Sequence, residues 1–252
     1  MHPVTRPLVR SSRSRSPDSS LIHSHNQTAA RSSRSRSRDP GHHPSAVRRS
    51  RSRAHSPGKL GTMKKAETNR FILFHSKSKE LGPNYTSLGF PKDTAKILSN
   101  FHEGTELRFR GDDYVSVENA FQGQKYACLL HPESPIQPSD FAKGGKYGHT
   151  AMDAKKAGGK GFMSKQRVAL DIRRWNEISH SLMRELIEAK VGQDTHIQRI
   201  LQLCSTHNVQ LFHHSRSDML WGCHVDQNSG QIKKGENLLG AIFMDIAHRI
   251  ST

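Results

Sequence analysis

The distribution of aromatic residues divides this chain of 252 residues into two parts. Residues 1–70 contain no Phe, Trp or Tyr, and the first aromatic residue is Phe71. The same segment has 16 Lys and Arg against three acidic residues, so it carries +13 of the net charge of +17. Such a segment cannot bury enough apolar surface to offset the entropy of ordering its backbone. Residues 1–70 are therefore predicted to be disordered, whereas residues 71–252 are long enough for a single packed core.

Arg and Ser alternate in three stretches of the N-terminal segment, at 11–16, 32–38 and 48–53. This pattern resembles the Arg-Ser domains of splicing and nuclear proteins. Each Arg can neutralise a phosphate of a nucleic acid, and phosphorylation of each Ser would cancel or invert that charge. A solvated basic tail without a dedicated partner fits the pattern equally well. We expect contact with nucleic acid and a nuclear location, with the cytoplasm as the alternative.

The same composition is also typical of an organelle transit peptide, which is rich in Arg and Ser and poor in acids. Its apolar residues are too sparse for a long amphipathic helix, which argues against this interpretation. Cys128, Cys204 and Cys223 are odd in number and widely separated, which favours a reducing compartment over a disulfide framework. No run of about 18 apolar residues is present, so no contact with a membrane is expected. The sequence does not indicate an oligomeric state.

The hydrophobic pattern of the C-terminal part predicts a mostly helical α+β domain with a small antiparallel sheet. The expected strands are 71–75, 106–110, 114–117 and 209–212, the middle two joined as a hairpin. The expected helices are 117–130, 164–191, 195–205 and 237–249. Ser116 is placed to cap the first of these helices. The order of elements lacks the βαβ alternation of a doubly wound sheet.

Three polar residues share one face of the helix expected after the hairpin. Glu118, Gln122 and Lys125 lie at positions i, i+4 and i+7, whereas Val117 and Phe121 belong to its apolar side. A polar stripe is most often only the solvated face of a helix, and a Glu in the first turn suits the helix dipole. Spacing alone therefore leaves both a solvated and a functional interpretation open.

Five blocks of sequence, in this order, carry a resemblance to a known family. They are LSNF at 98–101, SVENAFQGQK at 116–125, Trp175 with Lys190 and Gln193, Asp218 with Trp221-Gly222, and GENLLG at 235–240 with Met244. Together with Ser76-Lys77 they are similar to the signature of the NADAR (NAD and ADP-ribose, YbiA-like) family over about residues 71–249. The resemblance implies cleavage of an N-glycosidic bond without cofactor or metal. The implied substrates are ADP-ribose attached to guanine, or ribosylamine intermediates of riboflavin synthesis.

The resemblance also assigns roles to individual side chains. Breaking a C1′–N bond builds positive charge on the sugar, and the carboxylate of Glu118 would stabilise that charge and activate water. Gln122 and Lys125 would hydrogen-bond sugar hydroxyls, base or phosphate. Trp221 would stack on the base or ribose, and Gly222 would let the backbone approach closely. The remaining residues expected to bind substrate are Lys77, Ser99, Asn100, Phe101, Asp218 and Asn237.

Several residues have competing interpretations. Asn237 begins the last expected helix, so it either directs free N–H groups at a phosphate or is an ordinary N-cap. Trp175 is expected in the core, and the Lys155-Lys156 pair either contacts phosphate or is solvated. The Cys and His pairs match no zinc spacing, so no metal site is expected.

Two departures from the family pattern bear on activity. His224 stands where the family usually has Gly, and His213-His214 stand where an acidic residue is common. A His can act as a general acid near neutral pH, which is compatible with catalysis. The favoured hypothesis is removal of ADP-ribose from guanine in nucleic acid. Its alternatives are cleavage of a ribosylamine phosphate, binding of ADP-ribose without cleavage, and an Arg-Ser adaptor whose folded domain is passive.

Overall fold

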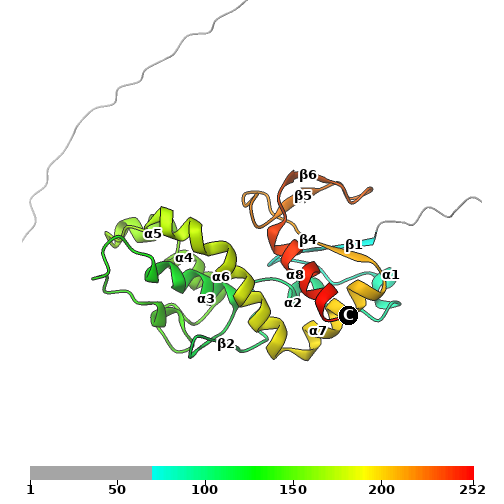
Figure 1. Ribbon diagram of the computed structural model, residues 1–252, viewed down its shortest axis with the longest axis horizontal. Coiled ribbons are helices and arrows are strands. Elements are labelled where there is room, and N and C mark those ends of the chain that lie inside the picture. Colours follow the sequence, from blue (N-terminus) through cyan, green and yellow to red (C-terminus); the bar gives the residue numbers. More distant parts are fainter. Residues whose placement is uncertain (1–69) are drawn as a thin grey trace, which may run out of the picture. The chain divides into compact units, whose positions relative to one another are not determined.

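The computed structural model describes residues 70–252, and the disorder expected for residues 1–70 lies, apart from Arg70, outside the described residues. Helices make up most of the regular structure of this part (Figure 1). They are α1 (Pro83–Thr86), α2 (Thr94–Ile97), α3 (Val117–Gln124), α4 (Ala151–Ala157), α5 (Lys160–Lys165), α6 (Ile172–Gln193), α7 (Thr195–Thr206) and α8 (Leu238–Arg249). The strands are β1 (Arg70–Phe74), β2 (Leu107–Phe109), β3 (Asp112–Tyr114), β4 (Val209–His213), β5 (Cys223–Val225) and β6 (Ile232–Gly235). The predicted mostly helical α+β fold is thereby confirmed.

The strands form three separate pairs, of which β2–β3 and β5–β6 are antiparallel. The third pair corrects the prediction of an antiparallel sheet, because β1 and β4 are parallel, with Arg70 beside Val209 and Phe74 beside His213. Parallel strands need a long crossover, and α1 to α7 lie between these two along the chain. Both strands therefore end at the same edge, and the segments that follow them leave the sheet together.

The β2–β3 hairpin is tighter than predicted. Its turn is Arg110-Gly111, and both residues have positive φ, 52° and 94°, as in the two-residue turns that fit the twist of a hairpin. The side chain of Gln193, at the end of α6, bonds the backbone of Arg108 twice, accepting from N at 2.8 Å and donating to O at 2.9 Å. The Gln193 amide thus takes the place of a neighbouring strand along β2.

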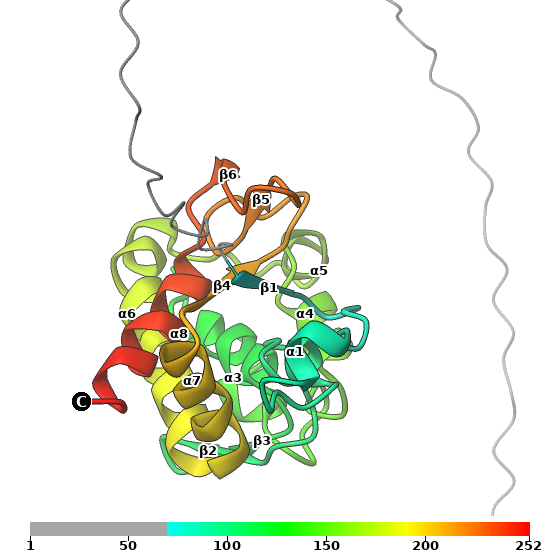
Figure 2. The same ribbon diagram turned by 90° about the vertical axis from the view of Figure 1, so that its right-hand side faces the viewer.

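Helix α3 lies in the interior of the domain (Figure 2), and all of its residues are buried. Ser116 caps it as predicted, because its Oγ accepts a hydrogen bond from the Asn119 N–H at 3.2 Å. The helix ends at Gln124 and continues as one 3-10 turn, so it is shorter than expected. A helix that is buried all round has no solvated face, so its polar residues must face protein groups or a cavity.

The helix expected over 164–191 begins later than predicted, because residues 164 and 165 end α5, residues 166–171 are not helical, and α6 starts at Ile172. Arg167, between α5 and α6, has a left-handed backbone with φ of 55°, which ends helical hydrogen bonding there. Asp171 then starts α6 as its N-cap, with Oδ1 accepting from the Arg174 N–H at 3.0 Å. Trp175 consequently lies in the first turn of the long helix.

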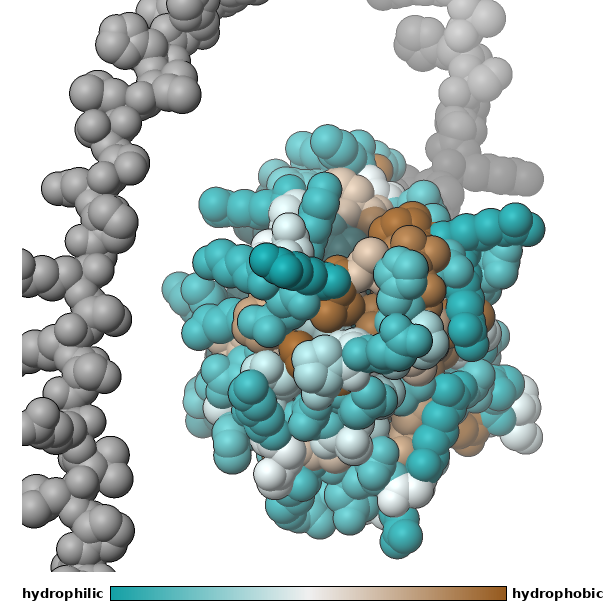
Figure 3. Space-filling model, turned by 90° about the vertical axis from the view of Figure 1, so that its left-hand side faces the viewer, coloured by the Kyte–Doolittle hydropathy of each residue, from teal (hydrophilic) through white to brown (hydrophobic). Residues whose placement is uncertain are grey.

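The large apolar side chains are mainly interior. Phe74 of β1 packs edge-on against Phe243 of α8, with ring centroids 5.7 Å apart. The three cysteines are buried and free. The face of the domain shown in Figure 3 is mostly hydrophilic, with apolar side chains gathered in small patches. None of the helices between residues 70 and 252 has the length and apolar character needed to cross a membrane.

Candidate active site

A pocket of about 750 Å³ opens where β1 and β4 end, with α3 and α6 contributing to its wall. It brings together nine of the eleven residues that the sequence assigned to the site. These nine are Lys77, Ser99, Asn100, Phe101, Glu118, Gln122, Lys125, Asp218 and Trp221. Segments far apart in the sequence thus meet around one cavity.

Glu118 is the central acidic group of this pocket and is only 7% exposed. Gln122, one turn later on α3, donates from Nε2 to Glu118 Oε1 at 2.8 Å. The backbone N–H of Glu118 donates to the carbonyl of Asn100 at 3.0 Å, which joins the start of α3 to the segment after α2. Burial raises the pKa of Glu118, and the hydrogen bond from Gln122 and the charges of Lys155 and Lys125 oppose that rise.

Basic side chains line the pocket beside this carboxylate. Lys125 donates from Nζ to the carbonyl of Gly158 at 3.1 Å, and the same Nζ lies 5.7 Å from the ring centroid of Trp175. Lys155 Nζ lies 4.9 Å from the ring centroid of Phe101. Burial lowers the pKa of Lys125, and the charge of Glu118 opposes this. The basic residues of the lining are Lys77, Lys125, Lys155 and Arg216, against the two acids Glu118 and Asp218.

Two buried oxygens of the pocket residues have no hydrogen-bond partner in the protein. They are Asn100 Oδ1 and Gln122 Oε1, on side chains that are 9% and 7% exposed. The matching nitrogens are engaged, since Asn100 Nδ2 contacts Met183 Sδ at 3.5 Å and Gln122 Nε2 bonds Glu118. Buried oxygens of this kind normally accept a hydrogen bond, so a ligand with hydroxyl or N–H donors would satisfy them.

Three aromatic rings form a series beside the carboxylate. Phe121 of α3 lies edge-on to Trp175 and to Trp221, with centroid distances of 5.0 Å and 5.8 Å. Trp175 packs against the core as predicted, but it also lines the pocket. Two indole rings are therefore available to a planar or apolar part of a ligand.

Gly222 and Asn237 lie outside the pocket lining, and both have structural contacts instead. A Cβ on Gly222 would lie 2.6 Å from Ser215 Cβ and 2.8 Å from His213 O, so the chain passes too closely for any side chain. Asn237 accepts from the His213 N–H at 2.8 Å and donates to Leu211 O at 3.0 Å, joining β4 to α8. Asn237 is the N-cap residue of α8, as one interpretation predicted, but its backbone is left-handed and its side chain makes no capping hydrogen bond. No contact with substrate is assigned to either residue.

Several residues that line the pocket were not predicted from the sequence. Besides Trp175, these are His75, Phe121, Met183 and residues 215–217. Ser76, His213, His214 and Lys155 also line the pocket; the sequence had singled them out, with contact to phosphate as one of two interpretations of Lys155. The residues that follow β1 and β4 would have been found from a parallel pairing of the two strands, because their ends then meet at one edge. Within residues 70–252, no group of three or more His, Cys, Asp or Glu side chains is arranged to hold a metal ion.

A buried carboxylate, unpaired amide oxygens, lysines and two indoles define a site for a polar, anionic ligand with hydroxyl donors and a planar part. The NADAR domain profile matches residues 89–251, so the chain belongs to the NADAR domain family, as the sequence blocks predicted. Among solved structures, the NMR structure of the E. coli protein YbiA matches with a TM-score of 0.46 and 22% identity, covering 62% of this chain and 79% of that chain. No curated protein sequence matches the chain. Membership of the family is consistent with N-glycosidase activity.

Proposed function

We propose that this protein is an N-glycosidase that removes ADP-ribose from guanine in nucleic acid. The observation that carries the proposal is the buried carboxylate of Glu118 in the pocket, hydrogen-bonded to Gln122 and near two lysines. A carboxylate whose pKa is raised holds a proton more readily than a solvated one, so it is suited both to accept a proton and to return it. Family membership supports the same reaction class.

In the proposed reaction Glu118 acts as the base and then as the acid. Water adds to C1′ of the ribose as the C1′–N bond breaks, and the water gives a proton to the carboxylate. The nitrogen leaves with the bonding electron pair and takes that proton, so free ADP-ribose and unmodified guanine result. The negative charge of Glu118 also stabilises the positive charge that develops on the sugar.

The remaining lining residues suit the parts of this substrate. The unpaired oxygen of Asn100 would accept a hydrogen bond from a ribose hydroxyl, and Gln122 would hold the carboxylate of Glu118 in place beside the sugar. Lys125 and Lys155 would neutralise phosphate charge. The indole of Trp221 offers a face for a base.

The Arg-Ser segment is the basis for placing the substrate in nucleic acid and the protein in the nucleus. Its arginines would bind phosphates without regard to sequence. Replacing the four arginines of 48–53 by Gln should raise the KM for a modified oligonucleotide and weaken its dependence on salt. The kcat for a modified mononucleoside should not change, because the pocket is untouched. Equal KM values for both proteins would contradict this part of the proposal.

The first experiment measures release of free ADP-ribose from a guanine-ADP-ribosylated oligonucleotide in EDTA. Wild type should release it, whereas Glu118→Gln should lose at least about 10²-fold in rate, the lower range for removal of a general acid–base group. Glu177→Gln is the matched control, because Glu177 is an exposed carboxylate of α6 in an ion pair with Arg173. Full activity of Glu118→Gln would refute the catalytic assignment.

Other outcomes distinguish the alternatives. Binding of the modified oligonucleotide without release by wild type would favour an ADP-ribose-binding module. Neither binding nor release would direct the search to ribosylamine phosphates, which share the C1′–N bond and the phosphate. Activity that needs only the Arg-Ser segment would favour the adaptor.

A further inference from the structure

Histidine rings gather on one wall of the pocket. His75 follows β1, His213 ends β4 and His214 follows it, and all three line the cavity. The centroids of His75 and His214 are 6.0 Å apart, and His214 lies 5.6 Å from His224 of β5. Because β1 and β4 are parallel, the fold itself places these rings together at one edge.

The hydrogen bonds of these rings leave donors and acceptors unused. His75 Nδ1 accepts from the Lys77 N–H at 3.0 Å, so a neutral His75 carries its proton on Nε2. His213 Nδ1 lies 3.3 Å from the carbonyl of Trp221. His214 Nδ1 is buried and has no partner within the described part of the chain. A ligand is the natural source of the missing interaction.

The charges facing the wall are mainly positive. The charge of Lys77 disfavours protonation of His75. Protonation of His214 is disfavoured by the charges of His224, His75 and Arg216. The carbonyl of Trp221 and the carboxylate of Asp218 favour the protonated ring of His213, whereas His75 and Lys155 disfavour it. Burial is the largest cause that lowers the pKa of each of the three rings.

An anion beside such rings favours their protonated form. Neutral rings that are partly buried beside one another resist protonation because each added charge would be poorly solvated and would repel its neighbours. A negative group at hydrogen-bond distance favours the protonated rings, which then become additional donors. Binding of the anion is therefore coupled to uptake of protons.

We infer that His75, His213 and His214, together with Lys77 and Arg216, form a phosphoryl subsite that takes up protons when an anion binds. This deepens the proposed function, on which it rests for the identity of the substrate, by locating where a phosphate of ADP-ribose lies.

The test is calorimetric titration of the full chain with ADP-ribose in EDTA, in two buffers of different ionisation enthalpy. The phosphates of ADP-ribose do not titrate between pH 5.5 and 7.5, so proton uptake reports on the protein. Wild type should take up protons, and its affinity should rise by up to about tenfold per pH unit for each proton taken up as the pH falls. His214→Gln and His75→Gln should each weaken binding and reduce the uptake, whereas the exposed His131→Gln should change neither.

Inorganic sulfate, a dianion over the same pH range, separates this inference from the proposed function. If sulfate binds with proton uptake but ADP-ribose does not bind, the subsite stands and the substrate assignment fails. If ADP-ribose binds without proton uptake, or with uptake unchanged in both His→Gln variants, the inference is overturned. Circular dichroism of each variant would show that it is folded, so that loss of uptake is attributable to the ring.

Discussion

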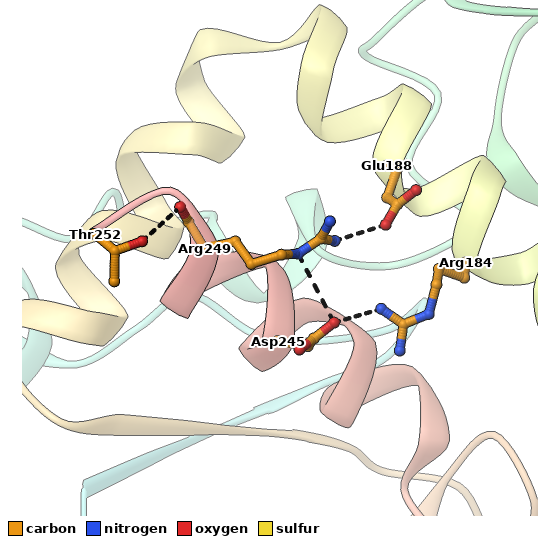
Figure 4. Close-up of polar contacts among 5 residues, drawn as sticks. All are labelled: Arg184, Glu188, Asp245, Arg249 and Thr252. Carbon is orange, nitrogen blue, oxygen red and sulfur yellow. Dashed lines mark hydrogen bonds and ion pairs between the residues drawn. The ribbon is translucent and has the colours of Figure 1, made fainter.

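Two carboxylates on helices, each with basic neighbours, show what burial does to a charged group. Asp245 of α8 accepts a hydrogen bond from Arg184 of α6 and lies 3.9 Å from Arg249 Nε (Figure 4). Its side chain is 50% exposed, and the Arg184 hydrogen bond lowers its pKa. Glu118 of α3 is 7% exposed, and burial raises its pKa despite the lysines around it. Two carboxylates with basic neighbours thus have pKa values shifted in opposite directions.

The two carboxylates differ in their hydration. The carboxylate of Asp245 is solvated whether or not Arg184 bonds it, so the pair adds little to stability. Glu118 loses its hydration on folding, and one amide hydrogen bond does not replace it. A group that is held in an unfavourable state of this kind is typical of a functional site. If burial causes this difference, substitutions at buried charged groups should have larger effects than substitutions at the exposed pair.

The largest effect is expected from crowding the partner of Glu118. A Cβ on Gly158 would lie 2.0 Å from Gln122 Oε1, so Gly158→Ala must move the Gln122 side chain away from the carboxylate. Glycosidase activity should fall by about 10²-fold, as expected for a displacement of about 1 Å in an active site. Gly161→Ala is the control, because a Cβ there meets nothing within 4 Å. Unchanged kcat/KM for Gly158→Ala would show that the position of Gln122 does not matter.

Lys190 is a second buried charged group, and its burial makes stability depend on pH. Lys190 of α6 is 2% exposed and donates from Nζ to Ile97 O at 2.6 Å and Ser99 O at 2.9 Å. Burial lowers its pKa to about 7. Between that value and the unfolded pKa of 10.5, the unfolded chain binds the proton more strongly, so stability should rise with pH.

Lys190→Met should remove this dependence. The free energy of unfolding of wild type, minus that of the variant, should rise by up to about 1.4 kcal/mol per pH unit between pH 7 and pH 10. Urea unfolding at three pH values measures it, with the exposed Lys160→Met as the control that should follow wild type. Parallel curves for wild type and Lys190→Met would contradict the prediction.

Much of the fold was predictable from local sequence. Ser116 before an amphipathic run predicts a capped helix, and apolar runs predict β1 and β4. The ends of the helices were harder to predict. Arg167 separates α5 from α6 with a left-handed backbone, but it is not a glycine, so the sequence does not indicate the break. The parallel pairing of β1 with β4 depends on contacts across most of the domain, which local patterns do not encode.

The candidate site was predictable from ordered motifs but not from spacing. Helical spacing placed Glu118 and Gln122 on one face, but burial of that face depends on elements packed around α3. The motifs also included Gly222 and Asn237, which hold the backbone between β4 and α8. Some residues of a motif are therefore required for the fold and others for binding a ligand, and the sequence does not distinguish the two groups.

Removing the charge of Glu118 should raise stability. Because its folded pKa is raised above 4.5, its ionised form opposes folding, and this loss grows as the pH rises through the folded pKa. Glu118→Gln should therefore be more stable than wild type at pH 7.5, by about 0.5–2 kcal/mol, the range typical of single stabilising substitutions. Urea unfolding should show a smaller difference at pH 5. A variant less stable at both values would mean that the carboxylate supports the fold.

The smallest effect is expected at the surface pair. Asp245→Asn removes the ion pairs to Arg184 and Arg249 but leaves no buried group without a partner. Because the folded pKa of Asp245 is lowered from 3.8, its contribution is present above that value and is lost as the pH falls. The urea midpoint at pH 7 should shift by less than for Lys190→Met or Glu118→Gln, and the shift should vanish in about 1 M salt, where charges are screened within about 3 Å. A large shift that survives salt would mean that exposed pairs between α6 and α8 hold the domain together, and burial would then not be what separates the two carboxylates.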